Sequence, residues 1–374
     1  MMPNEVSIDL GAIRDNFVEI RRLAGPEARI LAVVKSDAYG HGMIPVARTL
    51  EAAGVDYLGV FELEEALDLR KAGVTVPVLI MMGITPEEVS LTVDNRLTPA
   101  LFQQDVAEML SQKSLKQGVA TPVHIKVDTG MTRLGVPLEE LDGFLRSLVP
   151  LKGLGLEGIF THLAVSDQPN HPFTVRQIQA FGEAVEKSRR VGVCMGAVHI
   201  SNSGALLEQS GLDFVMVRPG ILLYGSAPGE VWAAGSFRPA MTFRSKVIQV
   251  RTVPPGTSIS YGCTYRTTSR AIIATVPVGY DDGYSRLLSN KGEALIQGTR
   301  VPVVGRVCMN LTMVDVTSLE GVAVGDEVVF LGAQGSERVT AEEIADKMGT
   351  ISYEVYCSIG KSNRRVYIDP GKDG

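Results

Sequence analysis

The chain has 374 residues, of which 45% are hydrophobic and 21% are charged. This length exceeds one ordinary compact domain, whereas an α/β barrel of about 250 residues would leave room for a second, smaller domain. The formal net charge is −6, with acidic and basic residues interspersed, which argues against nucleic acid or an anionic membrane surface as the main partner.

The four cysteines show no CxxC or Cys/His spacing, so they predict reduced thiols and no metal site. The N-terminus lacks a basic region followed by a long apolar stretch, and no run of about 18 apolar residues is present. The sequence therefore predicts a soluble, cytoplasmic protein.

The first two thirds of the chain repeat one unit, a short apolar run followed by a loop and a helical pattern. The eight apolar runs cover residues 30–35, 56–61, 76–81, 96–102, 122–128, 155–162, 197–201 and 213–219. Most carry β-branched residues, as buried parallel strands do, and the stretches between them have the apolar spacing of amphipathic helices. Eight such units predict a (β/α)8 TIM-type barrel over residues 1–235, in which Pro99 makes the fourth strand the weakest.

The pattern changes near Ser236. Short runs rich in β-branched residues then follow one another, with turn residues between them, at 243–250, 256–265, 271–280, 293–309, 311–317 and 326–332. They predict a mostly antiparallel β domain over residues 236–374, joined to the barrel by a linker at 227–239. One helix is expected in this domain, after Thr340, with Glu343 completing a capping box.

Ionisable residues stand at the C-terminal ends of four of the predicted barrel strands. Lys35 closes the first strand, Lys126 and Asp128 the fifth, His162 the sixth and Arg218 the eighth. Because barrel enzymes carry out their chemistry at this end, we expect these side chains to share one site.

Lys35 is the most informative of these residues. It ends an apolar run, where an amine is costly unless it is paired or used covalently, and a lysine with a lowered pKa forms Schiff bases with carbonyl cofactors. Taken alone, a lysine that extends from a strand end to solvent is the simpler interpretation. The adjoining segment 37–42 favours the cofactor, because it is a glycine-bordered loop with a phenol able to bind phosphate.

Motifs along nearly the whole chain resemble those of the alanine racemase family. They are AVVKSDAYGHG, HIKVDTGMTRLG, GIFTHLA, HISNSG, VRPGILLYG, ISYGCTYR, PVGYDDGY, GRVCMN and ISYEVYC, in the family's order. The first looks like the family's cofactor-lysine signature, with Ser36 where alanine is usual. The resemblance implies a cytoplasmic isomerase that uses pyridoxal 5'-phosphate to interconvert L-alanine and D-alanine, a peptidoglycan precursor.

The resemblance also implies the residues that serve the cofactor. Lys35 would hold it as an internal aldimine and act as one catalytic base; Tyr261, from the other subunit of a homodimer with shared active sites, would be the second. Arg218 would face the pyridine nitrogen, and His162 would lie against the ring and relay to Arg218. The groups implied to bind the phosphate are Tyr39, Ser203, the backbone of Gly220 and Ile221, and Tyr353.

Further roles follow from the same resemblance. Arg133 and Met309 would bind the substrate carboxylate, and Tyr280, with Tyr353, would narrow the entrance. Lys126 matches a lysine that is often carboxylated in the family, the alternative being an ordinary lysine balanced by chloride or by a neighbouring carboxylate.

Two further positions need comment. Asn310 stands where the family commonly has aspartate, which bears on substrate range more than on the reaction. His124 is expected to be structural. His199 is expected to pack below the cofactor, outside the catalytic set.

Three alternatives remain open at this point. A broad-specificity or serine racemase would share these catalytic residues. An amino-acid decarboxylase of similar architecture would place an acid at the pyridine nitrogen, unlike Arg218. A non-catalytic pyridoxal-phosphate-binding protein would lack the C-terminal β domain.

Overall fold

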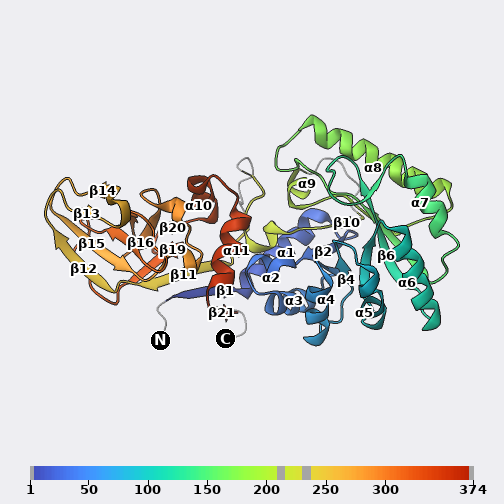
Figure 1. Ribbon diagram of the computed structural model, residues 1–374, viewed down its shortest axis with the longest axis horizontal. Helices are drawn as coiled ribbons and strands as arrows, with labels where there is room; N and C mark the ends of the chain where they lie inside the picture. The colour runs from blue at the N-terminus through green and yellow to red at the C-terminus, as the bar shows by residue number, and fades with distance from the viewer. Residues whose placement is uncertain (1–3, 209–214, 230–236, 370–374) are drawn as a thin grey trace. The chain divides into compact units, whose positions relative to one another are not determined.

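The computed structural model describes residues 4–208, 215–229 and 237–369 (Figure 1). Their contacts form two compact units. The first comprises residues 1–12, 39–42 and 238–374, and the second comprises residues 13–38 and 43–237. In the described part of the chain, no helix combines the length and the apolar character needed to cross a membrane.

The second unit is built on eight parallel strands in the order β10-β2-β3-β4-β5-β6-β8-β9. At the two ends of this order, Arg218 N donates to Ser201 O (2.8 Å), just beyond β10 and β9, so the barrel is nearly closed. The strands are β2 (Arg29–Val33), β3 (Tyr57–Val60), β4 (Val78–Ile80), β5 (Thr98–Leu101), β6 (Thr121–Asp128), β8 (Leu154–Phe160), β9 (Ala197–His199) and β10 (Met216–Val217).

Each of the eight predicted runs overlaps one of these strands, which confirms the barrel. Residues 213 and 214 of the eighth run lie outside the described residues. The fourth strand forms despite its proline, since Pro99 still pairs in register with Ile80 of β4.

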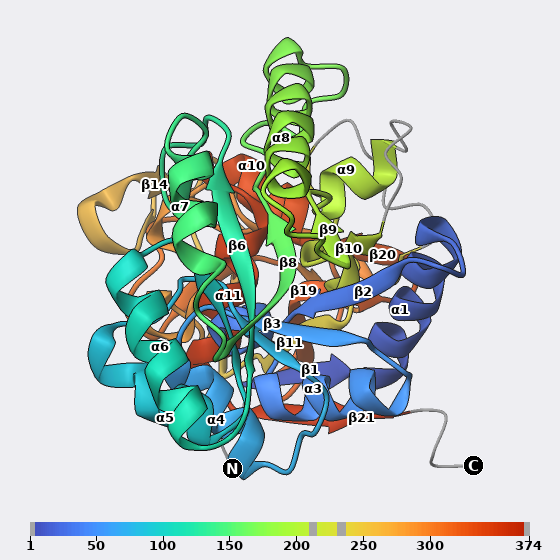
Figure 2. The ribbon, with the colours of Figure 1, turned by 90° about the vertical axis from the view of Figure 1, so that its right-hand side faces the viewer.

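Helices lie on the outside of these strands (Figure 2). They bury one apolar stripe each; in α3, for example, Val46, Ala47 and Leu50 are buried. The helices of this unit are α3 (Met43–Ala52), α4 (Leu63–Lys71), α5 (Val89–Asp94), α6 (Gln104–Lys116), α7 (Leu141–Leu148), α8 (Pro172–Arg190) and α9 (Ser203–Glu208); α1 (Leu10–Ala24) begins in the first unit and continues into this one.

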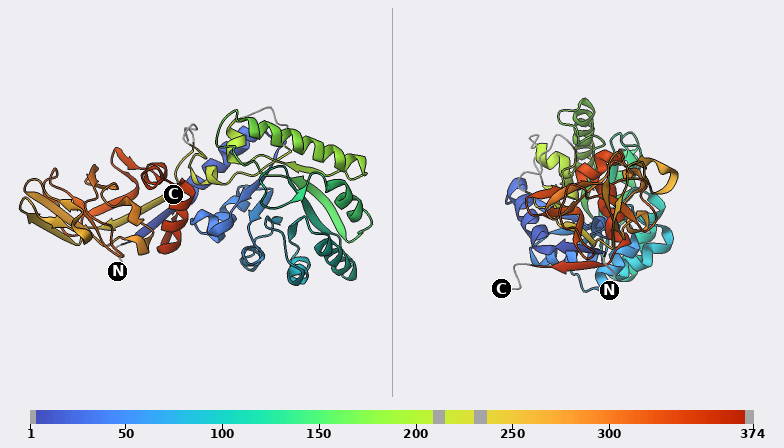
Figure 3. Two further views of the ribbon diagram at one scale, coloured as in Figure 1. Left: turned by 45° about the horizontal axis from the view of Figure 1, so that its top comes forward. Right: turned by 90° about the vertical axis from the view of Figure 1, so that its left-hand side faces the viewer.

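The first unit is a mostly antiparallel β structure, as the sequence predicts (Figure 3). Its main sheet has the order β17-β16-β19-β11-β1-β21, and a second sheet has the order β12-β15-β18. The strands are β1 (Glu5–Asp9), β11 (Met241–Lys246), β12 (Gln249–Val253), β13 (Ser258–Ile259), β14 (Tyr265–Arg266), β15 (Ala271–Val276), β16 (Glu293–Ile296), β17 (Thr299–Pro302), β18 (Thr312–Asp315), β19 (Glu327–Gln334), β20 (Glu337–Val339) and β21 (Arg365–Ile368).

The structure divides the chain differently from the predicted boundary at residue 235, because residues 1–12 belong to the unit that holds residues 238–374. β1 pairs antiparallel with β11 and parallel with β21, strands more than 200 residues away in the chain (Figure 1). Such long-range pairing leaves no local signal, so a pattern read along the chain assigns β1 to the barrel that follows it. Part of the predicted linker, residues 230–236, lies outside the described residues.

The expectation of one helix in this β domain was wrong, because it contains two. α10 (Ala341–Met348) begins as predicted, with Thr340 and Glu343 forming the capping box. The additional helix, α11 (Ser352–Ser362), buries Val355, Tyr356 and Ile359, and its short apolar spacing is hard to distinguish from that of a strand.

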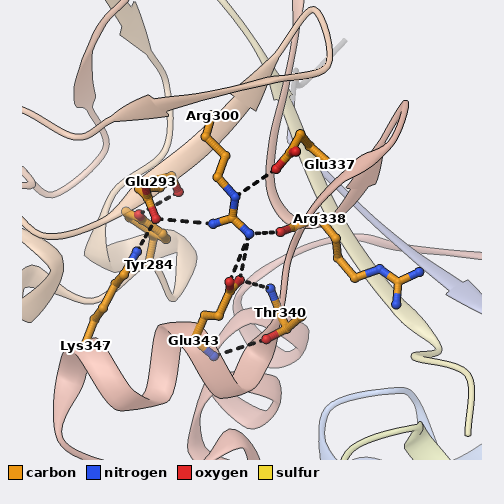
Figure 4. Close-up of polar contacts among 8 residues, drawn as sticks. All are labelled: Tyr284, Glu293, Arg300, Glu337, Arg338, Thr340, Glu343 and Lys347. Atoms are coloured by element: carbon orange, nitrogen blue, oxygen red, sulfur yellow. Dashed lines mark hydrogen bonds and ion pairs between the residues drawn. The ribbon is translucent and has the colours of Figure 1, made fainter. Parts of the chain in front are cut away.

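An ion-pair cluster joins α10 to the strands of this unit (Figure 4). Arg300 lies within ion-pair distance of Glu293 (3.2 Å), Glu337 (3.0 Å) and Glu343 (2.9 Å), and Lys347 pairs with Glu293 as well. These contacts connect β16, β17 and β20 with the helix that the capping box begins.

Candidate active site

Lys35 lies two residues after the end of β2 and begins a turn of unusual handedness. The next four residues, Ser36 to Tyr39, all have positive φ between 53° and 57°. Outside glycine, this left-handed conformation costs roughly 1–2 kcal/mol per residue, and such strain persists only where surrounding contacts impose it.

Three hydrogen bonds impose the turn. Ser36 N donates to Glu65 Oε1 (2.6 Å), Met43 N to Asp37 Oδ1 (2.7 Å), and Ala38 N to Val34 O (2.8 Å). The turn is therefore anchored to α4, to the start of α3 and to the end of β2. Nothing in the sequence pattern indicated it.

Four cations gather where the predicted strand ends meet: Lys35, Lys126, Arg133 and Arg218. Burial and the positive charges of the other three lower the pKa of the Lys126 amine to about 8. The same four cations, after burial, hold the pKa of His162 well below its usual value, so its ring is neutral at neutral pH. The structure therefore brings Lys35, Lys126, His162 and Arg218 close enough to affect one another's charge.

One carboxylate near this cluster is Asp128, which raises the pKa of Lys126 against the effects of burial and of the other cations. One of its oxygens, Oδ1, already accepts hydrogen bonds from Gly130 N (2.9 Å) and Thr132 N (3.0 Å). The Lys126 amine itself donates to Met81 O (3.1 Å). A site of this kind is suited to an anionic ligand.

A hollow of about 650 Å³ lies at the opposite, N-terminal ends of the strands. Its lining includes three arginines and three carboxylates, so these charges balance one another. They are Arg29, Arg70, Arg96, Asp56, Asp94 and Glu157. The four cations gathered at the other end of the strands make the Lys35 end the candidate active site.

Arg218 is buried, and the barrel backbone holds it in place. Its Nη1 donates to His199 O (2.8 Å), and its Nη2 donates to Thr161 O (2.7 Å) and Ile200 O (3.2 Å). Nη1 also lies 3.0 Å from His199 Nδ1. Burial lowers the pKa of the guanidinium to about 9, which leaves it protonated at neutral pH.

An arginine has five N–H donors, and the four on the two Nη atoms of Arg218 all have partners. The fifth, on Nε, is buried and has no partner among the residues that the structure describes. Arg218 therefore offers a single fixed donor to a ligand, and that donor matches a neutral aromatic nitrogen.

The histidine bonded to Arg218 is His199, which the sequence analysis left outside the catalytic set. In the described part of the chain, no hydrogen bond joins the ring of His162 to Arg218; the His162 carbonyl accepts from Gln177 (3.1 Å). His199 sits inside an apolar strand pattern, and no sequence signal distinguished it from a packing histidine.

Ser203 and Gly220 come together as expected. Gly220 N donates to Ser203 Oγ (3.0 Å), which joins the start of α9 to the residue preceding the short helix η2 (Ile221–Tyr224). A serine hydroxyl beside backbone N–H groups at a helix start is a common setting for phosphate, although η2 is only four residues long.

The remaining predicted residues belong to the first unit. The rings of Tyr39 and Tyr353 are 5.7 Å apart, and burial followed by the charges of Tyr353 and Cys357 raises the pKa of Tyr39 far above its usual range. Its phenol is therefore a protonated hydrogen-bond donor at every working pH.

Hydrogen bonds connect the loops that carry Tyr261, Tyr280 and Met309. Tyr280 N donates to Cys308 O (3.1 Å), and Asn310 Nδ2 donates to Asp281 Oδ2 (3.2 Å). Ser260 Oγ, beside Tyr261, donates to Arg306 O (2.6 Å), in the segment that leads to Met309. The three side chains are exposed by 71%, 43% and 55%, respectively. Exposed apolar groups gathered in this way are typical of an interaction surface.

Comparison with known proteins gives a consistent result. Residues 8–228 match the N-terminal domain of alanine racemase, and residues 240–367 match its C-terminal domain. A relative from Syntrophobacter fumaroxidans, described as alanine racemase, is 47% identical over 97% of this chain and 96% of its own length.

Two solved structures agree with these matches. Alanine racemase from a D-cycloserine-producing Streptomyces lavendulae has a TM-score of 0.95 and 32% identity, covering 100% of this chain and 99% of its own. The Bartonella henselae enzyme, described with covalently bound pyridoxal phosphate, has a TM-score of 0.89 and 28% identity, covering 98% and 100%.

A barrel with a strand-end lysine among cations, followed by a β domain, defines the class of barrel-type pyridoxal phosphate enzymes. Within this class, the chain belongs to the alanine racemase family. Members of this family are isomerases that depend on pyridoxal phosphate.

Proposed function

We propose that the chain interconverts L-alanine and D-alanine by two-base proton transfer, with Lys35 and Tyr261 as the bases. The observation that carries the proposal is the position of Lys35, just beyond the end of β2, within a group of cations that also includes Lys126, Arg133 and Arg218.

The residues fit pyridoxal 5'-phosphate. Its phosphate and phenolic oxygen are anionic, which suits the cations, and its pyridine nitrogen suits the unpartnered Nε–H of Arg218. Once bound, the cofactor withdraws electrons from the substrate's α-carbon and so makes the α-proton removable. The groups that would hold it are Lys35, Tyr39, His162, Ser203, Arg218, Gly220, Ile221 and Tyr353.

Racemisation removes the α-proton from one face of the carbon and returns a proton to the other. Two bases on opposite faces achieve this without any movement of a single base across the plane. In our proposal, the Lys35 amine exchanges the proton of D-alanine and the Tyr261 phenol that of L-alanine.

Arg218 would donate to the pyridine nitrogen, and because an arginine cannot accept a proton, that nitrogen would stay unprotonated. This arrangement favours return of the proton to the α-carbon over side reactions, and it argues against the decarboxylase alternative.

Arg133 and the Met309 backbone are proposed to bind the substrate carboxylate. If the Lys126 amine is carboxylated, the resulting carbamate would orient Arg133. Two observations support this modification: Lys126 is buried, and the pKa of its amine is lowered to about 8. Tyr280, with Tyr353, would limit the size of the side chain admitted.

We infer a homodimer with shared sites, in which the side chain of Tyr261 would reach the partner subunit's Lys35; the exposure of Tyr261 supports this inference. Tyr280 and Met309, exposed near it, would be covered by the same association. A cytoplasmic location remains a prediction from the sequence.

The experiment is direct. The purified protein, supplied with pyridoxal phosphate and L-alanine, is followed for D-alanine by chiral chromatography, with L-serine, L-lysine and L-arginine in parallel. We expect D-alanine as the main product, and we expect Lys35→Ala to abolish its formation. The control is Lys152→Ala, which removes an exposed lysine outside the candidate site. Inversion of another amino acid in place of alanine would point to a broad-specificity racemase, and inversion of none would contradict the proposal.

A further inference from the structure

Two buried histidines continue the hydrogen-bonded row that begins at Arg218. Arg218 Nη1 lies 3.0 Å from His199 Nδ1, and His199 Nε2 lies 2.8 Å from His124 Nδ1. The rings of His199 and His124 are 1% and 0% exposed, so water does not compete for these contacts. His124 has no part in the proposed chemistry.

The order of donors and acceptors in this row determines where each proton lies. Arginine can only donate, so the contact from Arg218 is a hydrogen bond only when His199 Nδ1 is the unprotonated nitrogen. In that tautomer, His199 carries its proton on Nε2 and donates it to His124. His124 Nδ1 must therefore accept, which places the His124 proton on Nε2.

The row ends at His124. In the described part of the chain, His124 Nε2 is buried and has no hydrogen-bond partner, so no acceptor can take a proton from it. Burial, followed by nearby arginines, lowers the pKa of His124 to about 3, and burial lowers that of His199 well below its usual value. Both rings are neutral, and the row is a static arrangement that does not conduct protons.

Packing holds the two rings in this geometry. A Cβ at Gly158 would lie 2.7 Å from His124 Nδ1, so only glycine leaves room for the ring there. His199 is stacked on Phe160, with centroids 4.8 Å apart and 12° between the planes. Tyr57 lies against the other ring, with centroids 5.6 Å apart.

We propose that His124 is a positioning residue. His124 accepts the hydrogen bond from His199 Nε2–H and so favours the tautomer in which His199 Nδ1 can accept from Arg218. That contact helps to hold the plane of the Arg218 guanidinium, which directs the Arg218 Nε–H toward the bound cofactor. Three of the acceptors around Arg218 are backbone carbonyls; His199 Nδ1 is the one side-chain acceptor, and it is present only in one tautomer.

The link from Arg218 to the cofactor rests on the proposed function, whereas the tautomer of His199 does not. The test therefore begins with the cofactor-free protein. Side-chain ¹⁵N NMR, with His199 assigned by its loss in His199→Gln, reports which ring nitrogen is protonated. We expect the proton on Nε2 in the wild type, a mixture of tautomers in His124→Leu, and the wild-type state in His124→Asn, whose amide oxygen can replace Nδ1 as acceptor.

The same variants are then loaded with pyridoxal phosphate. Loss of one buried hydrogen bond predicts for His124→Leu about a tenfold higher half-saturating cofactor concentration and about a tenfold lower kcat, with the KM for alanine little changed. His124→Asn should recover to within about threefold of the wild type. The thermal unfolding midpoint of each variant is measured alongside, as the control for packing.

A His199 tautomer that is the same in His124→Leu as in the wild type overturns the proposal. Equal impairment of His124→Asn and His124→Leu at equal unfolding midpoints does so as well. If the wild type neither binds pyridoxal phosphate nor racemises alanine, the proposed function fails, and the tautomer measurement still decides the part played by His124.

Discussion

Lys126 illustrates how position determines chemistry at the scale of a single residue. A lysine exposed to water is protonated at neutral pH, but this one is 6% exposed and surrounded by other cations. Carboxylation of its amine replaces a positive charge with a negative one, which relieves the repulsion among the cations and gives Arg133 a planar anionic partner.

The pKa of Lys126 predicts how carboxylation depends on pH. Carbon dioxide reacts with the neutral amine, with loss of an N–H proton, and the neutral fraction rises as pH rises through about 8. We expect a carbamate signal in ¹³C NMR of the loaded protein in ¹³C-bicarbonate that grows from mildly acidic to mildly basic pH. It should be absent in Lys126→Ala and present in Lys152→Ala. If the folded protein gives no carbamate signal at a pH above the pKa of Lys126, then Lys126 is an ordinary, unmodified amine.

At the scale of one element, the left-handed turn after Lys35 is the most strained feature of the candidate site. Four consecutive non-glycine residues with positive φ are unfavourable in isolation, so the turn depends on the contacts that hold it. Asp37 contributes twice, since aspartate tolerates this conformation better than most residues and its carboxylate accepts from Met43 N.

We therefore expect Asp37→Ala to cost about 2 kcal/mol, the value of a hydrogen bond to a charged acceptor. Because the turn carries Lys35, cofactor retention should fall as well. Asp37→Asn keeps the acceptor and the conformational tolerance, so it should lose much less. The measurements are thermal unfolding and the cofactor absorbance that remains after dialysis. Equal behaviour of the two variants would show that the carboxylate does not hold the turn.

The ion-pair cluster around Arg300 is a second case at this scale. No single pattern along the chain indicated it, because Glu293, Glu337 and Glu343 come from three different elements. Hydrogen bonding and attraction to Lys347 and Arg300 lower the pKa of Glu293, so the cluster stabilises the unit above the usual glutamate pKa and is lost as pH falls.

At the scale of the whole molecule, the two units divide the proposed chemistry. Lys35 belongs to the barrel unit and Tyr261 to the β unit. If each site combines Lys35 of one subunit with Tyr261 of the other, the smallest complete enzyme is a dimer.

Subunit complementation tests this arrangement. Lys35→Ala and Tyr261→Phe are each expected to be nearly inactive. In a heterodimer of the two, shared sites place both substitutions in one site and leave the other intact. Unfolding and refolding an equal mixture should therefore restore roughly a quarter of the wild-type activity. Restoration of no activity, with heterodimers present on a native gel, would mean that each subunit supplies both bases.

Much of the fold could be predicted from the sequence, because its signals are local. Strand and helix periodicities lie within short segments, and all eight barrel strands and the capping box at Thr340 were found in this way. The motifs likewise placed Lys35, Lys126, His162 and Arg218 at strand ends, which brings them together once the barrel topology is known.

Other features were visible only in the tertiary structure, because they depend on contacts between segments that are distant in the sequence. The pairing of β1 with β11 and β21, the left-handed turn after Lys35 and the row from Arg218 through His199 to His124 all join residues that carry no mutual signal along the chain. A histidine in an apolar strand has the same pattern whether it packs or accepts a hydrogen bond. Only the three-dimensional placement of its neighbours determines its protonation, because donors and acceptors must match one another through the buried row.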